Sequence, residues 1–363
     1  MNPSVLISVC LGILVGLIVA VAVAVAAARS WRKVRSRHCA SLADPLRTSL
    51  IELATGDDDG SLAEWFVGLP AREWRAVCPQ MIELCRKLDV ASTGSLRSVL
   101  TERGVLDRAI RDTRRRSAVR RAWAAMLLEL FPTVESRSAL LELLGDRDSD
   151  VRRMAVRGIG AIGDAACVRP VIGLLHGSNR VASASVGHSL ILLGSIAVDE
   201  LVVTVRTHPD ESVVVCCVEV LGHVGDPRAV TCLVDALRAT SNPDRLRVRV
   251  AAAQALGRLG SPKGIGGLIE GLKGESSELA VACIDALVGV GSAHAVPHIT
   301  ATLYSVDAPV AAAAAVALPK LGDVGVDALR SNAAAGDLAV VEAVSLLSAR
   351  ERHGLRTRVR VGA

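Results

Sequence analysis

Three glycines in the sequence match the spacing of a nucleotide-binding fingerprint. Gly158, Gly160 and Gly163 have the G-x-G-x-x-G spacing with which backbone N–H groups hold a pyrophosphate. That chemistry requires the glycines to follow a strand and to open a helix, where free N–H groups point at the phosphates. Here the surrounding apolar pattern places the glycines at the end of a helix, so we do not expect nucleotide binding.

Acidic and metal-ligating residues are present without the spacing of a metal site. Asp57, Asp58 and Asp59 form an acidic run, but an EF-hand needs alternating acidic positions and a glutamate at the twelfth position, where Gly68 stands. The eight histidines include no H-E-x-x-H motif and the nine cysteines no C-x-x-C pair. We therefore expect no metal, no cofactor and no catalytic residue.

The elements that carry these residues are indicated by a ladder of glycines. The steps between the glycines are 31, 31, 35, 31 and 31 residues. Such a period indicates one structural unit copied along the chain, and the copies stack into a solenoid because none can bury its apolar face alone. The ladder glycines are Gly163, Gly194, Gly225, Gly260, Gly291 and Gly322.

Apolar residues recur at fixed distances before each ladder glycine. Positions four, eight and twelve before the glycine are aliphatic residues, alanine or cysteine in every unit. Positions four apart share a helix face, so each unit is predicted to have an amphipathic helix of about thirteen residues that ends at the glycine. The glycine would adopt the left-handed conformation that ends a helix, and the Asp or Ser after it would cap a second helix. Cys167, Cys217 and Cys283 fall in apolar positions and are predicted to be small core residues.

Residues 144–164, LGDRDSDVRRMAVRGIGAIGD, contain the elements of a known repeat in order. An acidic turn is followed by a Val-Arg pair, an alanine and a terminal Gly-Asp. This segment resembles HEAT repeats, most closely the short bacterial variety named after phycobilin lyases. The resemblance covers about residues 115–350 and implies an all-α, right-handed α-solenoid of helix pairs. It also implies that the helices ending at the ladder glycines line the concave side.

Residues 5–28 contain no charged side chain and are predicted to cross a membrane. At about 1.5 Å per residue they reach roughly 36 Å, more than the roughly 30 Å of a hydrocarbon core. The basic residues that follow place the N-terminus outside and the remainder in the cytoplasm, and they are expected to contact lipid headgroups. A cleaved signal peptide is the alternative, but the segment lacks a basic start. The basic residues are Arg29, Arg32, Lys33, Arg35 and Arg37.

These patterns divide the chain into six predicted parts. They are a short extracytoplasmic N-terminus (1–4), a transmembrane helix (5–28), a basic juxtamembrane segment (29–43), an N-terminal helical region (44–113), the solenoid (114–352) and a basic tail (353–363). The run from Arg111 to Arg121 is compatible with lipid or acidic-partner binding and equally with a solvated helix start. Six aromatic residues precede the regular repeats and are expected to fill a less regular core.

A stripe of polar residues lies between the apolar positions of the repeats. Its members stand six or two residues before the ladder glycines, and because these positions are four apart they share one helix face. Varied polar residues on a shared stripe are typical of a recognition surface, although any exposed helix face is polar. The stripe consists of Arg157, His188, Glu219, His223, Gln254, Arg258, Asp285 and Lys320.

The sequence therefore favours a non-catalytic, membrane-anchored scaffold in the cytoplasm. We expect its solenoid to bind and organise a protein partner, such as a membrane enzyme, at the inner membrane. The alternative, suggested by the family resemblance, is a lyase-like or bilin-handling enzyme with a deep polar pocket. Nucleic-acid binding is disfavoured, because residues after 121 hold 23 Lys and Arg against 25 Asp and Glu, and Tyr304 is the only aromatic residue after 131.

Overall fold

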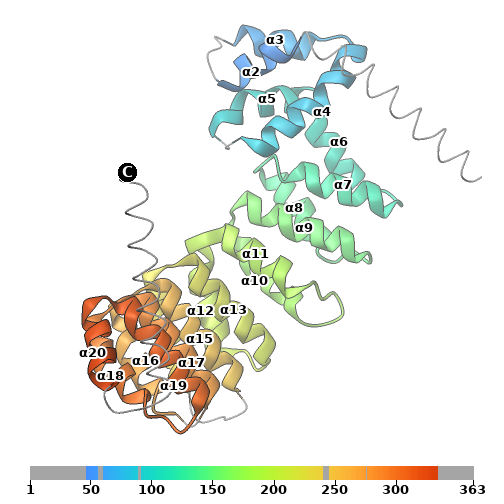
Figure 1. Cartoon of the computed structure of the whole chain (residues 1–363). Coiled ribbons are helices and arrows are strands. Elements are labelled where there is room, and N and C mark those ends of the chain that lie inside the picture. The colour runs from blue at the N-terminus through green and yellow to red at the C-terminus, as the bar shows by residue number, and fades with distance from the viewer. Residues whose placement is uncertain (1–45, 56–59, 89–90, 240–244, 275, 334–363) are drawn as a thin grey trace, which may run out of the picture. The chain divides into compact units, whose positions relative to one another are not determined.

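The computed structural model describes residues 46–55, 60–88, 91–239, 245–274 and 276–333. Within these ranges all regular elements are helices and no strand occurs, which confirms the predicted all-α class (Figure 1). The predicted transmembrane segment 5–28 and the basic residues 29–43 lie outside the described ranges. Among described residues, Ser183–Thr207 is long and apolar enough to cross a membrane. It comprises two helices of the repeats.

The chain divides into two compact units at Arg114 and Arg115. In the first unit Phe66 and Met81 are fully buried, and the guanidinium of Arg103 lies 4.5 Å from the ring centre of Trp74. Gly104 has a φ of 69° at the start of α6, like a ladder glycine, although the sequence did not place it on the ladder. The helices of this unit are α2 (Arg47–Thr55), α3 (Ser61–Gly68), α4 (Ala71–Lys87), α5 (Gly94–Glu102) and α6 (Val105–Asp112).

The second unit consists of helix pairs stacked in two layers (Figure 1). From α9 to α19, each first helix contacts the first helix before it and the second helix that precedes it in the chain. We call the first layer the first-helix layer; it contains α7 (Ala118–Leu128), α9 (Ser149–Ile162), α11 (Ser183–Leu193), α13 (Glu211–Val224), α15 (Leu246–Leu259), α17 (Ser277–Val290) and α19 (Ala308–Ala317). The second-helix layer contains α8 (Val134–Leu143), α10 (Val168–Ile172), α12 (Val198–Thr207), α14 (Val230–Arg238), α16 (Ile265–Gly271), α18 (Val296–Thr302) and α20 (Asp323–Ala333).

Five of the six ladder glycines directly follow a first helix, as predicted, and Gly322 follows the 3₁₀ turn after α19. All six have φ between 62° and 81°, a region that is costly for residues with a Cβ atom. Four of them have the left-handed helical conformation, whereas Gly194 and Gly322 have ψ of −139° and −162°. Those two glycines adjoin 3₁₀ turns, Gly194–Ala197 and Leu318–Leu321, so the chain leaves the helix in a different direction.

The predicted caps on the second helices form in three units. Side chains of Asp164, Asp226 and Ser292 accept hydrogen bonds from backbone N–H groups two residues later, at 2.8, 2.9 and 3.3 Å. Ser261 makes no side-chain cap bond. Ser195 and Asp323 lie inside the first turn of the following helical segment and therefore do not occupy the N-cap position before it.

The apolar positions form the core between the two layers. All residues four before a ladder glycine, from Ile159 to Leu318, are fully buried, as are the residues eight before it. Ala182, twelve before Gly194, is exposed because α11 begins one residue later and is shorter than its neighbours. Cys167, Cys217 and Cys283 are buried and unpaired, as predicted. Burial raises the pKa of Cys283 to about 12, so this thiol stays neutral.

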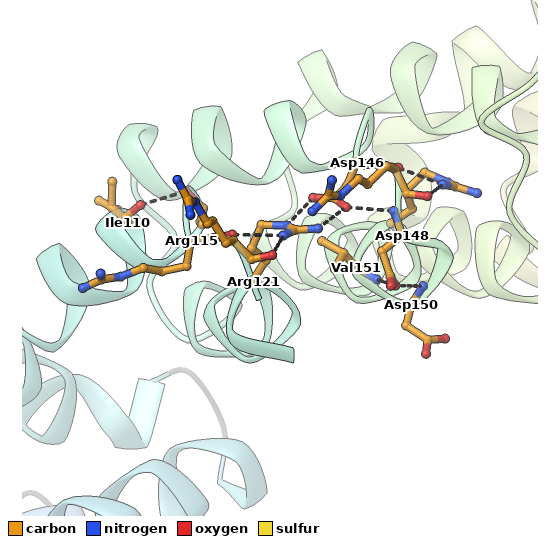
Figure 2. A network of polar contacts seen from close by, with 11 residues as sticks. Ile110, Arg115, Arg121, Asp146, Asp148, Asp150 and Val151 are labelled. Carbon is orange, nitrogen blue, oxygen red and sulfur yellow. Dashed lines mark hydrogen bonds and ion pairs between the residues drawn. The ribbon is translucent and has the colours of Figure 1, made fainter. Parts of the chain in front are cut away.

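Arginines at the fourth position of the first helices α7 and α9 hold the connections between helix pairs. Arg121 donates two hydrogen bonds to the carboxylate of Asp146, at 2.7 and 2.8 Å, and bonds the carbonyls of Arg115 and Arg116 at 2.9 Å (Figure 2). Arg152, one unit later, donates to the carbonyl of Asp146 at 2.7 Å. Arg121 is therefore buried and structural. The interpretation of the whole Arg111–Arg121 run as lipid-facing, partner-facing or solvated is wrong for this residue.

The aromatic residues only partly follow the prediction that they fill a core. Phe66 and Phe131 are buried, but Trp65 is 47% exposed and Trp123 55% exposed. Trp123 lies on α7, the first helix of its layer in the second unit. In later first helices, the residue at the position of Trp123 faces the first helix of the preceding pair. Because α7 is the first member of this layer, no preceding first helix covers Trp123.

Candidate functional site

All eight residues of the predicted stripe are exposed. They lie on consecutive members of the first-helix layer, except Lys320, which lies in the 3₁₀ turn after α19. Neighbouring helices of this layer contact each other at equivalent positions, as shown by Gly160 beside Ser189 and Gly257 beside Ala286. The structure therefore brings the stripe residues to the same face of the layer.

Charges on the second-helix layer are neutralised between neighbouring helix pairs. Four arginines form ion pairs with carboxylates of an adjacent pair, at N–O distances of 2.6 to 3.4 Å. Such exposed pairs contribute little stability, but they leave this surface with few unmatched charges. The pairs are Arg169–Glu200, Arg228–Asp199, Arg206–Asp235 and Arg238–Glu270.

Most charged residues of the stripe, in contrast, are not neutralised by an ion pair. Glu219, Arg258, Asp285 and Lys320 have no ion-pair partner among the described residues. Arg157 is the exception, because its guanidinium lies 3.4 Å from Glu129. The stripe therefore carries charged groups of both signs that are available to another molecule.

Small residues let most helices of the first-helix layer approach closely. The third residue before the ladder glycine is itself glycine in α9, α13 and α15. A Cβ atom added to Gly222 would lie 2.7 Å from the Cα of Ala255, and one added to Gly257 would lie 2.7 Å from the Cα of Ala286. At these steps the facing residue is small, so the two backbones meet without a gap.

The step between α11 and α13 departs from this pattern and leaves a groove. The facing residues there are Ile191 and Val220, both branched, in place of glycine and a small residue. Their side chains hold the helices apart, and a groove of about 290 Å³ opens between them. Its lining residues are Ser183, Ala184, Gly187, His188 and Ile191 of α11 and Cys216, Glu219, Val220 and His223 of α13.

The floor of the groove is apolar and its rim is polar. Gly187, Cys216 and Val220 are buried, whereas His188, Glu219 and His223 are exposed. The thiol of Cys216 lies 3.8 Å from the carbonyl oxygen of Ser183, and burial raises its pKa to about 11. Because the reactive form of cysteine is the thiolate, this group is not a nucleophile at neutral pH.

Sequence reasoning found the rim residues but missed the groove itself. The sequence does contain a signal for the groove. Ile191 stands three residues before its ladder glycine, where other units have Gly160, Gly222 and Gly257. The first unit contains a second groove, of about 560 Å³, between α2 and α4. Its carboxylate, Glu83, already lies 3.2 Å from the ammonium of Lys87. Among the described residues, no group of three or more His, Cys, Asp or Glu is placed to hold a metal.

Stacked helix pairs with a continuous core make the second unit an α-solenoid. Within it and just before it, residues 106–191 and 198–268 match the family model for HEAT repeats. The match begins eight residues before the start of the solenoid predicted at 114. No curated protein matches the sequence.

Several solved structures are similar to the chain at low sequence identity. The CpcE–CpcF complex of phycocyanin lyase from Nostoc sp. PCC7120 is 23% identical, covers 42% of this chain and 99% of its own, and has a TM-score of 0.38. Human deoxyhypusine hydroxylase is 20% identical, with coverages of 72% and 100% and a TM-score of 0.31. A Kap121p mutant is 11% identical, with coverages of 83% and 40% and a TM-score of 0.46.

Proposed function

We propose that this chain is a non-catalytic HEAT-repeat scaffold that binds a protein partner along the stripe. The observation that carries this proposal is the contrast between the two layers. Arginines and carboxylates of the second-helix layer pair with each other, whereas Glu219, Arg258, Asp285 and Lys320 of the stripe have no ion-pair partner among the described residues. Unmatched charges of both signs suit a partner surface with a complementary pattern.

The packing of the helices also supports the first-helix layer as the concave, partner-binding side of the solenoid. First helices contact one another more extensively than second helices do, with close backbone approaches at Gly222 and Gly257, and the more closely packed layer of a curved stack is the inner one. Solenoids bind their partners on such concave surfaces. Helix pairs at roughly 8–10 Å spacing give the seven pairs a surface on the order of 60 Å long. That length favours a macromolecular partner over a metabolite.

We expect charge reversal on the stripe to abolish partner recovery. The double variant Arg258→Glu/Lys320→Glu inverts two exposed, unpaired cations without removing a core contact. Interface charges that meet opposite charges contribute to affinity, and like charges placed opposite each other cost several kcal/mol. Crosslinking in intact membranes followed by pull-down should recover a specific protein with the native chain and not with this variant.

The matched control for this experiment is Arg180→Glu/Lys263→Glu. It makes the same change in net charge at exposed residues outside the stripe, so it should recover the partner as the native chain does. Equal recovery with both double variants, or no specific protein with the native chain, would contradict the proposed stripe.

We also propose that residues 5–28 anchor this scaffold in the inner membrane, with the solenoid in the cytoplasm. The support is the uncharged apolar sequence followed by Arg29, Arg32 and Lys33, which the positive-inside rule places in the cytoplasm. Protease added to intact spheroplasts should leave the solenoid uncut, and the same protease should digest it after lysis. Digestion of the solenoid before lysis would contradict this topology. A membrane enzyme is then a fitting partner.

The groove supports a binding role over a lyase-like or bilin-handling activity. Its volume of about 290 Å³ is at the lower limit of the roughly 300–1,000 Å³ typical of ligand pockets. The thiol of Cys216, the one cysteine among its lining residues, has a pKa raised to about 11 by burial. The groove is therefore suited to one long side chain of a protein partner.

A further inference from the structure

The α11–α13 groove is small and has aliphatic lining residues. Its aliphatic surface is formed by Ile191 on one side and by Val220 on the floor beside Gly187. A volume of about 290 Å³ corresponds to about ten waters at roughly 30 Å³ each. This is enough for the stem of one long side chain and for little else.

The rim of the groove offers hydrogen-bond acceptors. Nδ1 of His223 lies 2.8 Å from the backbone carbonyl oxygen of Glu219. A carbonyl can only accept, so Nδ1 carries the hydrogen and Nε2 of the neutral ring is left as an acceptor. The carboxylate of Glu219 accepts as well and has no ion-pair partner among the described residues. No lysine or arginine lines the groove.

We propose that this groove receives an arginine side chain from the protein partner that binds the stripe. The aliphatic stem would lie along Ile191 and Val220, and the guanidinium would donate to Glu219 and His223. Arginine fits better than lysine because its planar group presents five donors and can bond a carboxylate with two of them. This inference rests on the proposed function, and it names one chemical feature of the partner.

Gly187 is a position at which a side chain can be added inside the groove. A Cβ atom at Gly187 would lie 3.7 Å from both the Sγ of Cys216 and the Cγ2 of Val220, which is ordinary contact. Gly187→Leu therefore adds a side chain in the groove and also improves the helix propensity of α11. Gly266→Leu is the matched control, because Gly266 is an exposed helical glycine in α16 with no atom within 4 Å of an added Cβ.

The test is selection of peptides from a phage-displayed library of random 12-residue sequences. The purified full chain in detergent micelles is the target, in parallel with Gly187→Leu, Gly266→Leu and Glu219→Lys. We expect arginine to be enriched at one position with the native chain and with Gly266→Leu. Enrichment should disappear with Gly187→Leu, and Glu219→Lys should select Asp or Glu instead. For a selected peptide, Glu219→Gln should raise the Kd roughly ten- to a hundredfold.

The outcomes separate this inference from the proposed function. Selected peptides without arginine, or peptides that bind Gly187→Leu as tightly as the native chain, would overturn the groove assignment. If such peptides still lose affinity for Arg258→Glu/Lys320→Glu, the stripe remains supported. If no peptide is selected by the native chain, both the groove and the stripe are rejected.

Discussion

Replacing Arg121 by alanine should destabilise the N-terminal helix pairs of the solenoid by about 3–5 kcal/mol. The side chains of Arg121 and Asp146 are each only 8% exposed. Removing the guanidinium leaves the Asp146 carboxylate buried without its counter-ion, and it also leaves the carbonyls of Arg115 and Arg116 without a donor (Figure 2). Both changes leave buried polar groups without a hydrogen-bond partner, and in the folded state water does not replace the lost partner.

Hydrogen exchange of the full chain would measure this effect where it occurs. Stability in a stacked-repeat protein is approximately a sum over neighbouring units, so protection should fall in α7, α8 and α9 and persist in α15 and α17. The matched control is Arg120→Ala, which removes the same charge from the adjacent, exposed position and should change stability by less than about 0.5 kcal/mol. Equal protection in the two variants would show that the Arg121–Asp146 pair is not structural.

The Arg121–Asp146 ion pair should also make the stability of these helix pairs depend on pH. The hydrogen bond from Arg121 lowers the pKa of Asp146 below its ordinary value. A carboxyl group whose pKa is lower in the folded state stabilises the fold above its unfolded pKa, about 3.9. That stabilisation is lost as the pH falls through the folded pKa. Asp146→Asn should therefore be less stable than the native chain at neutral pH and lose less further stability between about pH 5 and pH 2.

The helix ends and the core of the solenoid could be predicted because their signals are local. A glycine with positive φ, such as Gly163, follows directly on a helix whose apolar residues repeat every three or four positions. Burial of Ile159 and its equivalents then depends only on which face of that helix is apolar. The shorter α11 and the different ψ of Gly194 could not be read in this way, because a 3₁₀ turn follows the helix directly there.

The candidate site was harder to predict because it depends on pairs of residues in different helices. The stripe residues were identified by their spacing, but the ion pair between Arg157 and Glu129 joins two positions 28 residues apart. Likewise, Arg121 belongs to a basic run in the sequence, and only its side-chain direction toward Asp146 shows that it is structural. The groove arises where two branched residues, Ile191 and Val220, face each other across a helix contact.

The same substitution should have opposite effects on stability at two helical glycines of the first-helix layer. In Gly257→Leu the new Cβ would lie 2.7 Å from the Cα and 3.0 Å from the Cβ of Ala286, atoms that cannot move without shifting α17. Overpacking of this kind typically costs about 1–3 kcal/mol, occasionally more. We place Gly257→Leu at about 3 kcal/mol, because the clash involves the backbone. Gly187→Leu has room in the groove and should stabilise the protein by up to about 1 kcal/mol through helix propensity.

Urea unfolding of the two variants beside the native chain, followed by circular dichroism, should move the midpoint down for Gly257→Leu and leave it unchanged or higher for Gly187→Leu. Both substitutions add the same side chain to a glycine inside a helix, so the intrinsic gain in helix propensity is similar and the difference reports the space that each new side chain meets. A fall of similar size in both would mean that α11 and α13 are as close as α15 and α17. In that case Ile191 and Val220 would not hold the groove open, and its binding role would fail with it.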